Sequence, residues 1–153
     1  MDTSRPRVSL TARLLGYSGL LPQMAAVLLT ASGGKAGALG YAIAIIYGAL
    51  ILSFLGGIWW GFATRRKAGQ GQLASLAVLP SLAAATIILW AGVLGDFTSP
   101  EPLIALGATV IATLAVDRHL AATGDAPPDW MRLRAPLSLG LGGLTILAGL
   151  LAV

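Results

Sequence analysis

Five long hydrophobic stretches, separated by short polar or glycine-rich links, dominate the sequence. They occupy approximately residues 14–32, 38–63, 73–94, 102–122 and 135–153. A helix needs about 20 mainly apolar residues to cross a bilayer, with a range of about 17 to 25, and each stretch meets or approaches that length. The pattern therefore predicts an all-α bundle of five transmembrane helices, forming one membrane domain over residues 1–153.

Positive charge is distributed unevenly among the links. If the N-terminus is cytoplasmic, nine of the ten Lys and Arg residues fall on the cytoplasmic side and only Lys35 falls outside. Cytoplasmic loops of membrane proteins carry this excess, so the count predicts N-in, C-out topology. The nine residues are Arg5, Arg7, Arg13, Arg65, Arg66, Lys67, Arg118, Arg132 and Arg134.

Composition supports a membrane protein and excludes several other classes. The chain is 56% hydrophobic and 10% charged, whereas soluble domains carry about 25% charged residues. It contains no cysteine, which excludes disulfides, thiolate metal sites and iron–sulfur clusters. The basic residues are scattered among apolar runs, so we expect no nucleic acid partner.

The second hydrophobic stretch contains small residues at a spacing of four: Ala49, Ser53, Gly57 and Gly61. Small residues at this spacing allow two helix backbones to approach closely in lipid. We favour packing within the chain over a dimer interface.

The fourth hydrophobic stretch combines hydroxyl groups with a carboxylate on one face: Thr109, Thr113 and Asp117. An ionisable group inside a membrane is a candidate proton or cation site. The alternative, which we favour, is that Asp117 lies near the cytoplasmic interface and pairs with Arg118, Arg132 or Arg134. An exposed pair of this kind would contribute only about 0–1 kcal/mol to stability.

Further polar residues offer weaker indications of function. A transport path would use Gln23, Ser53, Thr109, Thr113 and Asp117. The local patterns around Pro22 and Pro80 are similar enough to suggest a parallel repeat, although ordinary proline kinks are the simpler interpretation. His119 is the single histidine, so one chain cannot form a zinc or bis-histidine haem site, which leaves an interfacial, pH-sensitive role.

A basic group on the cytoplasmic side is a candidate site for anionic lipid head groups. It comprises Arg65, Arg66, Lys67, Arg132 and Arg134. The topology already requires positive residues here, so the group does not by itself indicate specific lipid binding.

Several segments, in order along nearly the whole chain, resemble one family. They are residues 16–22, 47–61, 79–82 and 130–137, of which Ser53-Phe54-Leu55-Gly56-Gly57 is the most specific. The chain is similar to the uncharacterised family that includes transmembrane protein sixty-nine. The resemblance implies a bacterial inner-membrane protein without an established activity. Trp59 stands where we expect a basic or histidine residue in many relatives, which puts a charge-based role there in doubt.

These observations favour a non-enzymatic role in binding or assembly. We find no catalytic motif and expect no catalytic residue, cofactor or metal site. The expected partners are membrane lipids, a small apolar ligand, a membrane protein or a second copy of the chain, with the Gly57 region as the contact face. The alternative is a self-associating transporter or channel for a small solute, cation or proton.

Overall fold

The computed structural model describes residues 9–94 and 99–152. The helical elements in these ranges are α1 (Leu10–Ser18), α2 (Leu21–Ala31), α3 (Gly34–Ala63), α4 (Gln70–Leu89), the π-helix η1 (Trp90–Leu94), α5 (Pro100–Ala122) and α6 (Trp130–Leu151). The described residues form no strand.

Five helical segments are long and apolar enough to cross a membrane, which confirms the predicted five-helix bundle. α1 and α2 together make the first segment, and η1 continues α4. The chain is therefore a multi-pass membrane protein. α6 begins at Trp130 and not at residue 135, so Arg132 and Arg134 lie inside the helix.

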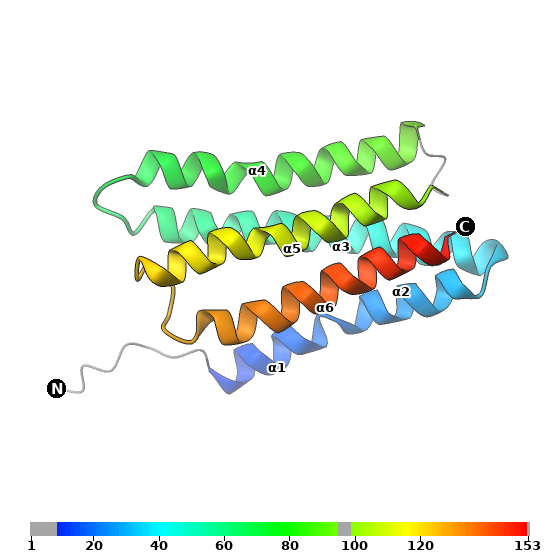
Figure 1. Ribbon diagram of the computed structural model, residues 1–153, viewed down its shortest axis with the longest axis horizontal. Helices are drawn as coiled ribbons and strands as arrows, with labels where there is room; N and C mark the ends of the chain where they lie inside the picture. The colour runs from blue at the N-terminus through cyan, green and yellow to red at the C-terminus, as the bar shows by residue number, and fades with distance from the viewer. Residues whose placement is uncertain (1–8, 95–98, 153) are drawn as a thin grey trace.

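The helices run side by side, with alternating direction (Figure 1). α1 starts at the same end of the bundle as the α3–α4 and α5–α6 links, whereas α6 finishes at the opposite end. We call the first end the basic end, because it carries Arg65, Arg66, Lys67, Arg118 and Arg132. Lys35 lies at the other end, and Arg5 and Arg7 lie outside the described residues.

The main core cluster lies between α2, α3, α5 and α6, and α4 with η1 adds Ala84, Ile87 and Ala91 to it. Its largest fully buried apolar side chains include Tyr41, Ile45, Leu52, Leu103 and Leu106. Large apolar residues on the outside of the bundle, such as Leu28, Leu50 and Phe54, remain exposed. This distribution suits a lipid solvent, in which apolar residues can face outward.

Glycines set the closest approaches between helices. A Cβ added to Gly142 of α6 would lie 2.6 Å from the carbonyl oxygen of Gly107 in α5, and a Cβ added to Gly107 would meet the Gly142 carbonyl in turn. Between α3 and α4, a Cβ on Gly56 would strike the carbonyl oxygen of Ala77. Such small residues allow backbone contact between membrane helices.

The prediction that the small-residue stripe of α3 packs within the chain is wrong for Gly57 and Gly61. Both are exposed, and no atom lies within 4 Å of an added Cβ. At 3.6 residues per turn, positions four apart advance by about 40° around the helix. The stripe therefore begins buried at Ala49, reaches a half-buried Ser53, and has turned outward by Gly57.

The two prolines with similar surroundings have different effects. Pro22 begins α2 after a break at Gly19 and Leu20, whereas Pro80 lies inside the continuous helix α4. At the break, the hydroxyl of Tyr47 donates to the carbonyl oxygen of Gly19 at 2.6 Å. A carbonyl freed in a membrane needs such a partner, and α3 supplies it to the first segment.

Candidate functional site

Asp117 of α5 is fully buried and accepts hydrogen bonds from three side chains. The indole Nε1 atoms of Trp59 and Trp130 each donate to Oδ1 at 3.1 Å, and Nε of Arg134 donates to Oδ2 at 2.9 Å. Nη2 of Arg134 also lies 2.9 Å from Oδ2. Both carboxylate oxygens are thus satisfied, and the negative charge is matched by one guanidinium.

The structure selects Arg134 from the three basic partners considered for Asp117. It differs from the expectation of an exposed pair, because the Arg134 side chain is only 7% exposed and that of Asp117 is 0% exposed. The pair is buried because α6 begins one turn before Arg134, which turns this side chain toward α5. Trp130, four residues earlier on the same helix face, reaches the same carboxylate.

Aromatic rings enclose the ion pair. The Trp130 ring centroid lies 5.9 Å from Cζ of Arg134, a cation–π arrangement, and 5.6 Å from the Phe62 ring at 82°. Trp59 is buried as well. The residue that departs from the basic or histidine side chain expected in relatives therefore acts here as a neutral hydrogen-bond donor to Asp117.

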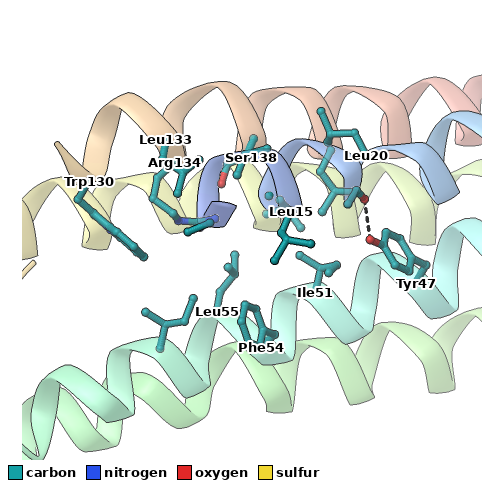
Figure 2. A pocket seen from close by; sticks show the side chains of 17 residues that line it. Leu15, Leu20, Tyr47, Ile51, Phe54, Leu55, Trp130, Leu133, Arg134 and Ser138 are labelled. Atoms are coloured by element: carbon teal, nitrogen blue, oxygen red, sulfur yellow. Dashed lines mark hydrogen bonds between the residues drawn. The ribbon is translucent and has the colours of Figure 1, made fainter. Parts of the chain in front are cut away.

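A cavity of about 410 Å³ adjoins the ion pair, between α1, α3 and α6. Figure 2 shows Arg134 and Ser138 of α6 on one side and Ile51, Phe54 and Leu55 of α3 on the other. Most lining side chains are hydrocarbon. The polar exceptions are Tyr47, whose hydroxyl is bonded to Gly19, and the group formed by Trp130, Arg134 and Ser138.

Two polar atoms of this lining have no hydrogen-bond partner among the described residues. One is Oγ of Ser138, a residue that is 1% exposed, and the other is Nη2 of Arg134. Nη2 lies 2.9 Å from Oδ2 of Asp117 within the ion pair, in a geometry that is not that of a hydrogen bond. Buried polar groups in proteins are ordinarily bonded, so these two donors are available to a third group.

Ser138 differs in this respect from the threonines buried in the bundle. Thr30, Thr113 and Thr145 each donate to a carbonyl oxygen of their own helix, at 2.9, 2.6 and 2.8 Å. This internal bond is the usual way for a hydroxyl to be satisfied inside a membrane helix. The hydroxyl of Ser138 makes no such bond.

The family of the chain follows from comparison with protein-family models. The model of a family described as protein of unknown function, DUF3429, matches residues 8–151. The chain belongs to the DUF3429 family. Comparison with curated proteins and with solved structures gives no match for this DUF3429 chain.

The polar residues proposed for a transport path lie at separate places in the DUF3429 bundle. Nε2 of Gln23 donates to Oγ1 of Thr145 at 2.8 Å, and Ser53 bonds with Ser81 at 2.9 Å. The hydroxyls of Thr109 and Thr113 donate to carbonyl oxygens of α5 itself. The cavity lining does not include Gln23, Ser53, Thr109 or Thr113.

The candidate residues for binding lipid head groups in the DUF3429 chain fall into a buried, a paired and an exposed group. Arg134 does not lie with the exposed basic residues, because it is buried and paired with Asp117. Arg66 forms an ion pair with Asp125 in the α5–α6 link, with Nε donating to Oδ1 at 2.9 Å. Arg65, Lys67 and Arg132 are exposed at the basic end, as is His119.

The Arg66–Asp125 pair has a clear electrostatic signature. Hydrogen bonding from Arg66, with a further bond from Thr123, lowers the pKa of Asp125 from 3.8 to about 2, against the opposing effect of burial. The same hydrogen bond raises the pKa of Arg66. The pair links the α3–α4 loop to the α5–α6 loop in the DUF3429 chain.

The sequence pattern indicated Arg134 and Asp117 as candidate residues, but it did not indicate that Trp130 and Ser138 belong to the same site. The spacing 130, 134, 138 places these residues on one face of a helix. That signal is visible only if the helix begins at Trp130, and the apolar stretch itself begins five residues later.

Proposed function

We propose that this DUF3429 protein has a non-enzymatic binding role and holds a lipid-like molecule in the cavity between α1, α3 and α6. The observation that carries the proposal is the cavity itself, about 410 Å³ and lined mainly by hydrocarbon side chains. Sites for small molecules typically measure about 300–1,000 Å³ and combine an apolar lining with a few polar groups. The cavity thus replaces the Gly57 region as the proposed ligand site.

The position of α1 supports entry from the membrane. No residue of α1 is buried, and Leu15 on this helix lines the cavity although it is 68% exposed. α1 approaches α6 at Gly16, where an added Cβ would lie 3.0 Å from Leu137. The cavity therefore lies close to the outer surface of the bundle at α1.

The test is to fill the cavity. Ile51→Trp places a large ring in the lining, and Leu50→Trp places the same ring on the 63% exposed outer face of the same helix. Native mass spectrometry of protein purified in mild detergent should show a lipid-mass adduct on wild type and Leu50→Trp that Ile51→Trp lacks. Ile58→Phe provides a second filled lining if Ile51→Trp does not fold.

An adduct that survives equally in the cavity-filled variants would place the lipid elsewhere on the protein. Wild-type protein without any adduct, even after incubation with excess lipid, would remove the proposal. The thermal unfolding midpoints of the variants serve as the control for folding.

A self-associating transporter is the second candidate. The exposure of Gly57 and Gly61 supports the self-association part, because these glycines are open to a second helix. In liposomes with a pH gradient, a proton or cation flux through wild-type protein that is absent from protein-free liposomes would favour transport over simple binding.

We also propose the finer description of the chain: a relative of transmembrane protein sixty-nine in a bacterial inner membrane, with its N-terminus in the cytoplasm. Membrane lipids are the proposed partners, together with a membrane protein or a second copy. The gathering of exposed Arg65, Lys67 and Arg132 at one end supports the orientation.

A further inference from the structure

We infer that the polar end of the cavity selects an uncharged lipid, which it recognises through a carbonyl oxygen that accepts hydrogen bonds from Arg134 and Ser138. This inference rests on the proposed binding function and adds the chemistry of the ligand. Its basis is the buried Ser138 hydroxyl, which has no hydrogen-bond partner among the described residues, beside Nη2 of Arg134 at one end of a mainly hydrocarbon cavity.

The charge balance at Arg134 favours a neutral ligand. The guanidinium is already matched by the carboxylate of Asp117, which receives two indole N–H bonds as well. An anionic head group would add a second negative charge beside Asp117 in a region of low dielectric, and an unpaired buried charge is costly. A cation would meet the guanidinium directly.

The hydrogen-bond balance favours a ligand with an acceptor. Nη2 of Arg134 has only N–H donors to offer, since a guanidinium has no acceptor. The Ser138 hydroxyl, which can donate, lies one turn further along the same face of α6. A hydrocarbon in the cavity would leave the buried Ser138 hydroxyl without a hydrogen bond, which is unfavourable, and would offer no acceptor to Nη2 of Arg134.

The shape of the lining sets the orientation of the ligand. The α6 residues of the cavity extend from Trp130 to Leu141, which is roughly 16 Å at the rise of an α-helix. Arg134 and Ser138 occupy the part toward the basic end. Beyond them, as far as Leu141 and Leu20, the lining is hydrocarbon except for Tyr47, whose hydroxyl is bonded to Gly19. In this orientation the carbonyl of the lipid lies toward the basic end, and the hydrocarbon chain of the lipid points away from that end.

Two kinds of lipid present this chemistry, a glyceride with its ester carbonyl and a prenylated quinone with its ring carbonyl. The experiment titrates delipidated protein with dioleoylglycerol, a prenylated benzoquinone, squalene as a hydrocarbon without oxygen, and dioleoyl phosphatidic acid as an anion. Native mass spectrometry in one detergent gives the relative Kd values.

The deciding variant is Ser138→Ala, which removes one hydroxyl and little volume. It should weaken binding of the preferred carbonyl lipid about fivefold, the effect of one neutral hydrogen bond, and leave squalene binding unchanged. Thr109→Val is the matched control, because that hydroxyl is bonded within α5 and is not among the residues that line the cavity. The carbonyl probe whose affinity falls in Ser138→Ala shows whether the site prefers a glyceride ester or a quinone ring.

The remaining outcomes distinguish the selectivity for a carbonyl from the existence of the lipid site itself. Equal affinity of wild type and Ser138→Ala for both carbonyl probes, or tightest binding of phosphatidic acid, would overturn the inference. If such binding is still blocked by Ile51→Trp, the proposed lipid site stands without this selectivity. If wild type binds none of the probes and carries no native adduct, both fail together.

Discussion

Arg134 and Asp117 form an ion pair inside the bundle, with Nε of Arg134 2.9 Å from Oδ2 of Asp117. The pair joins α6 to α5, and Trp59 of α3 donates to the same carboxylate. Three transmembrane helices are therefore tied together at one buried point near the basic end, next to the proposed ligand site.

Removing one partner of this pair should destabilise the protein strongly. Asp117→Asn leaves the Arg134 charge buried without a counter-charge, and breaking a buried pair costs about 3–5 kcal/mol. Thermal unfolding in detergent measures the effect. Glu101→Gln, at an exposed carboxylate, should change the midpoint little.

The double variant Asp117→Leu with Arg134→Met adds a second check. Because it removes both charges, it should be more stable than Asp117→Asn. A double variant as unstable as the single one would mean that specific hydrogen bonds, and not an unpaired charge, account for the loss.

Substitution of a glycine that touches a neighbouring helix should lower the stability of the protein more than substitution of a glycine that faces outward. Gly142→Ala places a methyl group 2.6 Å from the Gly107 carbonyl, and we expect a loss of about 1–3 kcal/mol from overpacking. Gly57→Leu should leave the stability of the monomer nearly unchanged. Thermal unfolding compares the two, and cross-linking in membranes shows whether Gly57→Leu alters a dimer.

The Arg66–Asp125 pair should make stability depend on pH in the acid range. The folded-state pKa of Asp125, about 2, lies below its ordinary value of 3.8, so the contribution is present above about pH 4 and disappears as the pH falls toward 2. Unfolding midpoints measured across this range should fall more steeply for wild type than for Asp125→Asn. Parallel profiles would show that the pair does not couple to folding.

The proposed orientation makes opposite predictions for two reporter positions. A reporter inserted between Arg66 and Gly69 should be cytoplasmic, and a reporter fused after Val153 should lie outside, because the positive residues concentrate at the basic end. Paired alkaline phosphatase and green fluorescent protein fusions measure this. Both reporters on one side of the membrane would contradict the arrangement of spans.

Sequence alone predicted the helices well, because long apolar runs have few alternatives in a membrane. It predicted helix faces less well. Gly57 and Gly61 lie outward while Gly56 packs against α4, since successive residues project about 100° apart around a helix. The sequence shows Asp117 as a carboxylate next to an apolar stretch. It does not show that Asp117 is buried, because this depends on where α6 starts and on the hydrogen bond from Trp59 of α3.

The hydrogen bond from Tyr47 to Gly19 has a consequence for the continuity of the first span. In lipid, a break within a helix frees a backbone carbonyl that no solvent can satisfy. Here the carbonyl at the joint is already held by α3, and the joint contains Gly19 followed by the rigid start of α2 at Pro22. Tyr47 thus anchors this joint to α3, so the break in the first span leaves the Gly19 carbonyl satisfied without any solvent.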